Sequence, residues 1–322
     1  MSTLPMNFIL IDTNKAIFQG WIHHYKELSV IISKYGLTNH YPFQLSFENI
    51  TIESLISNPN YPHINRSQHS AAVTPTNSLS YMGGGYDKYL LQALSLPTPT
   101  NNSSLDYKPL ESVIQHHTLK KFSGYLSVGT IHNIPLLETL DSSWYKTTYA
   151  YRYWNITNLI QIPSMMIPES LNHQNQHLQK LIGVFDSVWN LLISLHSNNS
   201  DYRDIKNIII PGIGSGYGEL SEFEISKIMI FAMVLFNLNL GTGERLLHLK
   251  KSCMILFFFN KNYQTLANIY DLNELETDVI TEYGKSVMLN RVKESESLSH
   301  ANIKEKSLTM EFDDLFKCIN LK

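Results

Sequence analysis

An asparagine and an aspartate flank three consecutive glycines in the stretch AAVTPTNSLSYMGGGYD, residues 71–87. A carboxylate such as that of Asp87 can act as a general base or orient a water molecule when its pKa and its reach suit the reaction. Glycine costs roughly 0.5–1 kcal/mol of folding free energy relative to alanine in regular structure. We therefore interpret Gly83, Gly84 and Gly85 as a place where some group approaches the backbone more closely than a Cβ would allow.

A second glycine-rich segment, PGIGSGYGEL at 211–220, lies between an apolar run and a helical pattern, as the first one does. Alternating glycines let successive N–H groups curl around a phosphate, and a following helix N-terminus favours negative charge. Two such loops predict one ligand whose diphosphate lies between them. The alternative is that both are tight turns for close packing. No Gly-Lys-Ser/Thr follows either loop, and the spacing is not that of the Rossmann fingerprint, so a dehydrogenase is disfavoured.

Short apolar runs alternate with helical patterns and must position these loops. Nearly continuous apolar strands suit a sheet that is covered on both faces, so the alternation predicts an α/β fold. A helix is also predicted directly after the triple glycine, and Ser221 and Glu224 form a capping-box pattern at the start of the last helix. The predicted strands are 8–12, 28–32, 69–74, 125–131, 157–163 and 207–211, and the predicted helices are 86–94, 177–196 and 221–241.

Turn-forming residues and changes in polarity predict the organisation of the chain. Residues 40–68 are expected to be poorly regular, and the segment 95–122, rich in Pro, Asn, Ser and Thr, is expected to be a surface insertion. We expect a ligand-binding domain over 1–245, an extension over 246–290 packed on that domain, and a polar, mobile tail over 291–322. That tail contains a short helical pattern, MEFDDLFKCI.

Composition narrows the classes of function. The net charge of the 322 residues is −3 and no run of Lys/Arg occurs, which argues against nonspecific nucleic-acid binding. Two cysteines favour a reducing compartment, and the longest apolar runs are shorter than the ~20 residues of a membrane span. We therefore expect no membrane association and a cytoplasmic location, with a nuclear one left open. The pairs His23/His24 and His116/His117 have no Cys or carboxylate at metal-ligand spacing, so neither a metal nor a cofactor is expected.

Both glycine-rich loops resemble the ligand loops of the macro domain family. VTPTNSLSYMGGGYDKYL is similar to the first loop, an Asn at a strand exit followed by a Gly-rich turn into a helix. IIIPGIGSGYGELSEFEISKIM is similar to the second, with Ser215 where Thr is common. FILIDTN and IQIPSMMIPES also resemble the fungal macro-domain-like subgroup. The resemblance covers roughly 7–240 and implies a three-layer α/β/α fold with a mixed central sheet that binds ADP-ribose at its C-terminal edge.

Roles for single residues follow from this resemblance. Asp12 would accept the adenine amino group, although it could also cap a helix, and Asn77 would bond the distal ribose, although it could instead form an Asx-turn. Asp87 would orient a water or a substrate hydroxyl, but Leu91 stands where hydrolytic members carry a histidine. Tyr217 could wall the distal ribose. The predicted catalytic residues are Asn77 and Asp87, and the predicted ADP-ribose-binding residues are Asp12, Thr13, Asn77, Gly83, Gly84, Gly85, Gly212, Gly214, Ser215, Gly216, Tyr217 and Gly218.

The function implied is binding of ADP-ribose with hydrolysis of an ADP-ribose 1″-derivative. The expected partner is ADP-ribose, ADP-ribose 1″-phosphate or an ADP-ribosylated protein, so the enzyme would be a phosphatase or an ADP-ribosyl hydrolase. Asn77 together with Asp87 favours an enzyme, whereas Leu91 favours the alternative, a noncatalytic ADP-ribose reader. The sequence leaves the leaving group open.

Overall fold

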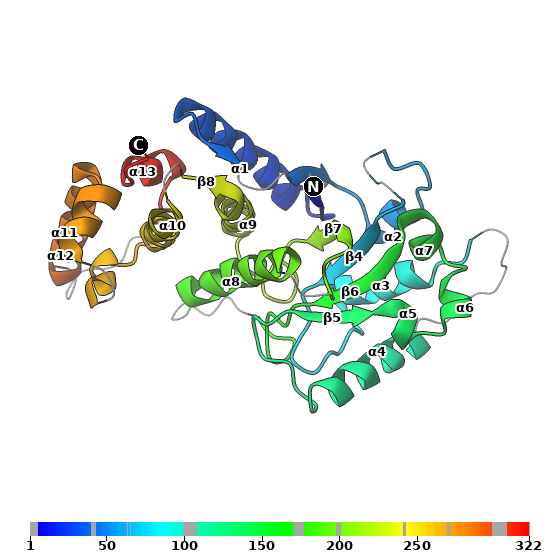
Figure 1. The fold of residues 1–322 in the computed structure, drawn as a ribbon. Coiled ribbons are helices and arrows are strands. Elements are labelled where there is room, and N and C mark those ends of the chain that lie inside the picture. The colour runs from blue at the N-terminus through cyan, green and yellow to red at the C-terminus, as the bar shows by residue number, and fades with distance from the viewer. Residues whose placement is uncertain are drawn as a thin grey trace. The chain divides into compact units, whose positions relative to one another are not determined.

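The computed structural model describes the chain except for residues 1–5, 40–42, 63, 65, 99–107, 171–176, 198–200, 241–242, 269–270, 298–307 and 322. The chain divides into two compact units, which Figure 1 shows in ribbon form. Unit 1 comprises Met1–His24 and Tyr41–Met233, and unit 2 comprises Tyr25–His40 and Val234–Lys322.

Unit 1 is built on a six-stranded mixed sheet with the strand order β3-β1-β7-β4-β6-β5. All neighbouring strands are parallel except β5, which runs antiparallel to β6. Every residue of β1 and of β6 is buried, as their nearly continuous apolar sequences predict. The strands are β1 (Met6–Ile11), β3 (Phe43–Glu48), β4 (His69–Thr74), β5 (His132–Pro135), β6 (Ile156–Gln161) and β7 (Ile205–Pro211).

Helices cover both faces of this sheet, with α8 on one face and α2, α3 and α7 on the other (Figure 1). The predicted three-layer α/β/α fold with a mixed sheet is confirmed. By length and composition alone α8 could cross a membrane, yet eight of its twenty residues are buried in the protein. The helices of unit 1 are α2 (Ile52–Ile56), α3 (Gly85–Ser95), α4 (Lys108–Lys121), α5 (Leu136–Thr139), α6 (Ser142–Tyr145), α7 (Tyr149–Trp154) and α8 (His177–His196). Two further helices, α1 (Lys15–Lys34) and α9 (Glu222–Asn237), contribute residues to both units.

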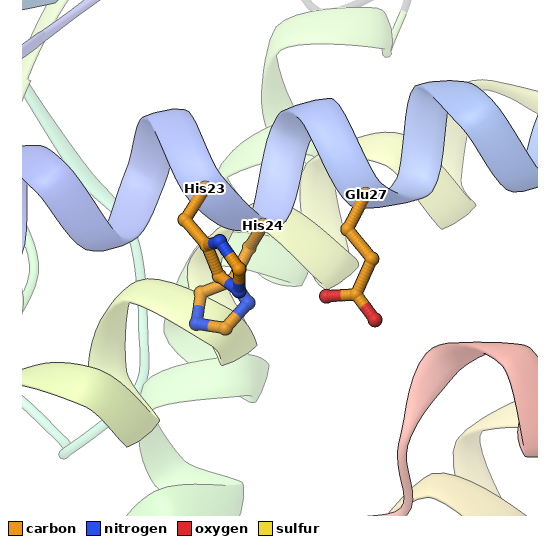
Figure 2. Close-up of side chains that lie close together, drawn as sticks. All are labelled: His23, His24 and Glu27. Atoms are coloured by element: carbon orange, nitrogen blue, oxygen red, sulfur yellow. The ribbon is translucent and has the colours of Figure 1, made fainter.

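Two predicted strands are wrong. Residues 28–32 are part of α1, a stretch of which Figure 2 shows, and the buried Leu28 and Ile31 fit helical spacing rather than alternation. Residues 125–131 form no strand, because Gly124 just before this stretch and Gly129 within it adopt positive φ, and the strand β5 begins only at His132.

Segments that were expected to be irregular contain regular structure. The range 40–68 includes β3 and α2, and α4 lies within 95–122. The capping box also fails at its second residue, since Glu224 pairs with His177 at 2.9 Å instead of turning back toward Ser221.

Unit 2 consists of helices and a two-stranded sheet. The strands are β2 (Thr38–Asn39) and β8 (Leu238–Asn239), and the helices are α10 (Glu244–Phe258), η2 (Tyr263–Asn268), α11 (Leu272–Glu274), η3 (Leu275–Val279), α12 (Glu282–Ser297) and α13 (Phe312–Lys317). The predicted terminal helix is therefore present as α13. The polar stretch expected from residue 291 begins inside α12, and 298–307 lies outside the described residues.

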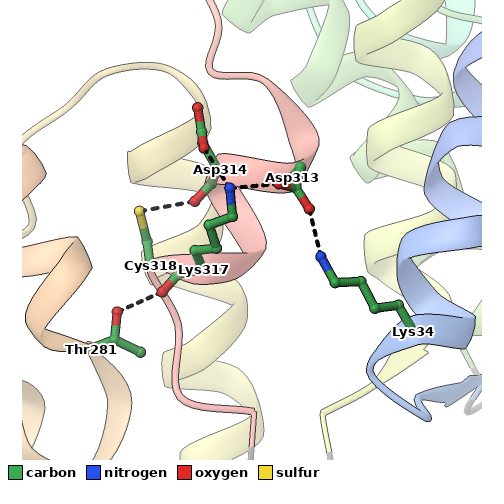
Figure 3. A network of polar contacts seen from close by, with 6 residues as sticks. All are labelled: Lys34, Thr281, Asp313, Asp314, Lys317 and Cys318. Carbon is green, nitrogen blue, oxygen red and sulfur yellow. Dashed lines mark hydrogen bonds and ion pairs between the residues drawn. The ribbon is translucent and has the colours of Figure 1, made fainter.

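A polar network ties α13 into unit 2, as Figure 3 shows. Lys317 Nζ lies 2.5 Å from Asp313 Oδ2 and 3.1 Å from Asp314 Oδ1, and Lys34 Nζ lies 3.0 Å from Asp313 Oδ1. Thr281 Oγ1 donates to the carbonyl of Lys317 at 2.5 Å. The ion pairs are partly exposed, so each contributes little to stability on its own.

Candidate functional site

A pocket of about 750 Å³ opens in unit 1 where β1, β4 and β7 end. This volume is within the usual range for a small-ligand site. In open sheets with parallel strands, ligands commonly bind beyond the carboxyl ends of the strands. The lining comes from five segments, 11–13, 50–53, 75–89, 164–168 and 211–218. Every residue of the predicted site lines this pocket except Gly83.

The loop after β7 presents a row of backbone donors. Two of its carbonyls accept within the loop, since Leu220 N donates to Gly214 O at 3.2 Å and Glu219 N to Gly216 O at 3.1 Å. Within the part of the chain that the structure describes, the N–H groups of residues 214–218 donate to no acceptor. Gly214 has a φ of +87°, which requires glycine. Five successive free N–H groups ahead of the N-terminus of α9 form a site for an anion.

Two tyrosines of the protein explain part of the triple glycine. The Tyr81 ring occupies the space where a Cβ on Gly83 would lie, and the Tyr217 hydroxyl would be 2.9 Å from a Cβ on Gly84. Gly85 has a φ of +56° and begins α3. The family resemblance implied a ligand against all three glycines. In the structure, the groups nearest to Gly83 and Gly84 are the side chains of Tyr81 and Tyr217 at the pocket rim.

Asn77 forms the Asx-turn that was the alternative to a ligand contact. Its Oδ1 accepts from Leu79 N at 3.1 Å and Tyr81 N at 3.3 Å, and its Nδ2 donates to Tyr81 O at 2.8 Å. The side chain is buried and still lines the pocket. Asn77 therefore fixes the shape of residues 77–81, and its Nδ2 retains one further hydrogen for a ligand.

Asp87 lies in the first turn of α3 and is 8% exposed at the pocket wall. Thr74 Oγ1, at the end of β4, donates a hydrogen bond to Asp87 Oδ1. Burial raises the pKa of Asp87 to about 7, while the hydroxyls of Thr74 and Thr76 act in the opposite direction and the charge of Glu111 adds to the rise. A carboxyl group that titrates near neutrality can exchange a proton at physiological pH.

Asp12 follows β1 on another side of the pocket. Asn14 N donates to its Oδ1 at 2.8 Å, and burial raises the pKa of Asp12 while the N–H groups of Asn14, Gly212 and Thr13 lower it. Asp12 does not cap the helix as the alternative suggested, because Asn14 accepts from Ala16 N at 2.9 Å. Asp12 is thus held toward the pocket by backbone donors.

Sequence reasoning missed Glu53, which also lines the pocket. It lies on α2, inside the range that was expected to be irregular, so no helical signal pointed to it. The charged lining then consists of Asp12, Glu53 and Asp87, and no Lys, Arg or His among the described residues joins them. A phosphate in this pocket would therefore bind to backbone N–H groups and neutral side-chain donors.

Comparison with known families fits this geometry. Residues 2–266 match the macro-like domain family, which is most of the chain. The chain belongs to the macro-like domain family. The resemblance seen in the two loops is therefore confirmed, and membership suggests ADP-ribose binding as the general function.

Leu91, which stands where hydrolytic members of the family carry a histidine, lies outside the pocket of this macro-like domain. Leu91 is fully buried in the hydrophobic core between the sheet and the helices α2, α3 and α7. It does not line the pocket. The side chain four residues after Asp87 consequently points to the core, and a histidine at this position would not reach a ligand without a rearrangement of α3.

One cluster elsewhere has the donor set of a metal site. His23, His24 and Glu27 lie close together on α1, with their ligand atoms within 4.8 Å of one another (Figure 2). The prediction that the histidine pair lacks a nearby carboxylate is therefore wrong, because Glu27 follows His23 by one helical turn. His24 is also 1% exposed rather than on the surface. Burial, His23 and the Lys227 ammonium lower the pKa of His24 to about 4, and the same ammonium disfavours a bound cation.

Proposed function

We propose that this macro-like domain binds ADP-ribose in the pocket of unit 1 and hydrolyses a bond at C1″ of the distal ribose. The observation that carries the binding proposal is the row of free N–H groups at 214–218, which suits the diphosphate. The adenine then lies toward Asp12, whose carboxylate accepts from its amino group. The distal ribose lies toward Asn77 and Asp87.

Asp87 supports the hydrolytic step. Its carboxylate accepts a proton from a water molecule, the water oxygen forms a bond to C1″, and the bond between C1″ and the leaving oxygen breaks. The leaving oxygen takes up the proton that Asp87 removed from the water, which restores the carboxylate, so the products are ADP-ribose and a hydroxyl or acid group. Thr74 holds the carboxylate in one orientation. A pKa of about 7 leaves a substantial ionised fraction at neutral pH and a basicity suited to proton transfer.

A noncatalytic ADP-ribose reader is the second candidate. It is favoured by the burial of Leu91 in the core and by the engagement of Asn77 in its own turn. In a reader, Asp87 contributes to the shape of the pocket and exchanges no proton with a substrate.

Titration calorimetry with ADP-ribose tests the binding, and turnover of an ADP-ribosylated protein tests the chemistry. In the hydrolase, Asp87→Asn keeps the affinity for ADP-ribose within severalfold and lowers turnover by ~10²–10⁴. Asp141→Asn removes the same charge from an exposed carboxyl group outside the pocket and should change neither quantity. Absence of binding heat from the folded protein would refute ADP-ribose binding. Binding without turnover would identify a reader.

A further inference from the structure

We propose that helix α4 holds residues 77–82, which contribute to the pocket wall, in the shape that binds ADP-ribose. The positioning residues on α4 are Glu111, Gln115 and Thr118. None of the three lines the pocket, so they act on a ligand through residues 77–82. This inference rests on the proposed binding of ADP-ribose. It gives a function to a helix in the range 95–122, which was expected to be a surface insertion.

Two side chains of α4 form hydrogen bonds with the backbone of this loop. Glu111 Oε1 accepts from Met82 N at 3.1 Å, and Gln115 Nε2 donates to Leu79 O at 3.2 Å. The two side chains are four residues apart and therefore lie on the same face of the helix. One contact holds the middle of the loop and the other holds its end.

A third contact from this face of α4 is buried. Thr118 Oγ1 donates to Gln161 Oε1 at 3.1 Å, and Gln161 Nε2 donates to Ser80 Oγ at 2.7 Å. All three side chains are fully buried, and a buried network whose members find their partners favours a single arrangement. Ser80 has a φ of +53°, a strained conformation for a residue with a Cβ that persists only where the surroundings enforce it. The network on α4 and β6 supplies that constraint.

The loop that α4 holds carries part of the ligand site. Asn77 and Tyr81 line the pocket, and Met82 directly precedes the glycines that lead into α3. Groups that bind a ligand must lie within about 0.5 Å of their productive positions, and they depend on the residues behind them for this precision. Loss of the α4 contacts should therefore weaken ligand binding although no group that lines the pocket is removed.

Calorimetry with ADP-ribose tests this role of Glu111. The measurements are made at pH 8.5, because burial and the charge of Glu111 raise the pKa of Asp87 to about 7 and a Glu111 variant would otherwise change its protonation. Glu111→Ala removes the acceptor for Met82 N and should weaken binding about tenfold, the scale of one lost hydrogen bond. Glu111→Gln keeps an acceptor oxygen and should bind within about threefold of the wild type. Glu138→Ala, at an exposed position of α5 outside the pocket, should leave the affinity unchanged.

Hydrogen exchange distinguishes local positioning from a general loss of stability. The N–H groups of Leu79 and Tyr81 donate to the Asn77 side chain and report on the shape of the loop. In Glu111→Ala they should exchange about tenfold faster or more, while the buried amides of β4 keep their wild-type rates. In Glu111→Gln both sets should exchange as in the wild type.

Weaker binding with faster exchange confined to residues 77–82 is the expected result. Wild-type affinity in both Glu111→Ala and Gln115→Ala would overturn this inference and leave ADP-ribose binding intact. Equal acceleration of exchange in the loop and in β4 would also overturn it, because the effect would then be a loss of global stability. Absence of binding by the folded wild type would overturn the proposed function, and the inference with it.

Discussion

Replacement of Asp87 by asparagine should stabilise the folded protein increasingly as the pH rises. Burial at the pocket wall raises the pKa of Asp87 from 3.8 to about 7, so the folded state binds a proton more tightly than the unfolded state does. The stabilisation from this bound proton is fully present below pH 3.8 and is lost as the pH rises through about 7. Asparagine has nearly the same shape, stays neutral and loses none of this stabilisation.

The size of the effect follows from the two pKa values. One pKa unit corresponds to about 1.36 kcal/mol, so the whole range between 3.8 and about 7 amounts to ~4 kcal/mol. Between pH 5 and pH 8 the free energy of unfolding of the wild type should fall by ~2.5 kcal/mol relative to Asp87→Asn. Because Thr74 can donate to the amide oxygen of asparagine, the hydrogen bond itself is retained.

Urea unfolding at several pH values between 5 and 8 measures this difference, with the m-value of each variant checked for constancy. Other titrating groups contribute equally to both proteins and cancel in the difference. Asp141→Asn is the matched control, since the hydroxyl and N–H of Ser143 lower the pKa of Asp141 and its titration lies below this pH range. A difference between Asp87→Asn and wild type that stays constant from pH 5 to pH 8 would show that Asp87 is not desolvated in the folded protein.

Three further predictions concern the two loops and their surroundings. Gly216→Val should keep the stability of the wild type, since a Cβ there meets no atom within 4 Å, and should lose ADP-ribose binding in calorimetry because Gly216 lines the pocket. Ser215→Ala should lose only ~1 kcal/mol of affinity. Equal losses of affinity in the two variants would contradict the backbone-donor site. Leu91→His should lower the urea midpoint by the equivalent of ~2 kcal/mol or more without adding turnover, because it buries an imidazole in an apolar core. A gain in turnover at unchanged stability would refute the placement of this side chain in the core. Affinity for ADP-ribose should fall only slightly between 50 and 200 mM salt, about twofold, because no cationic side chain among the described residues lines the pocket. A steep loss would reveal a cationic contact.

The parts of the site that were predictable are those with local signals. Each glycine-rich loop follows a buried strand and precedes a helix, and parallel strands bring their carboxyl ends to one edge of the sheet. That geometry is sufficient to place Asp12, Asn77 and Gly214 around one pocket. The strands β1, β4, β6 and β7 were predictable for the same reason, since buried parallel strands are nearly continuous apolar runs.

The parts that were not predictable depend on contacts between distant residues. Glu53 reaches the pocket from a five-residue helix that carries no periodic signal of its own. The apolar run at 28–32 is short enough to fit a strand or a helix, and only its continuity with the preceding turns of α1 decides between them. Leu91 could be aligned with a catalytic histidine, but its burial depends on how α3 packs against α2 and α7.

Two loops of similar composition therefore do different chemistry in one pocket. In 214–218 the carbonyls of Gly214 and Gly216 accept within the loop, and the N–H groups of the five residues have no acceptor among the described residues, which leaves a site for negative charge. In 78–82 the N–H groups are used, and the negative charge that the N-terminus of α3 favours is supplied by Asp87 of the protein itself. An ionised Asp87 carboxylate occupies the position that the N-terminus of α3 favours for negative charge. The same position at the pocket wall leaves Asp87, with a pKa of about 7, as a group that can exchange a proton at neutral pH.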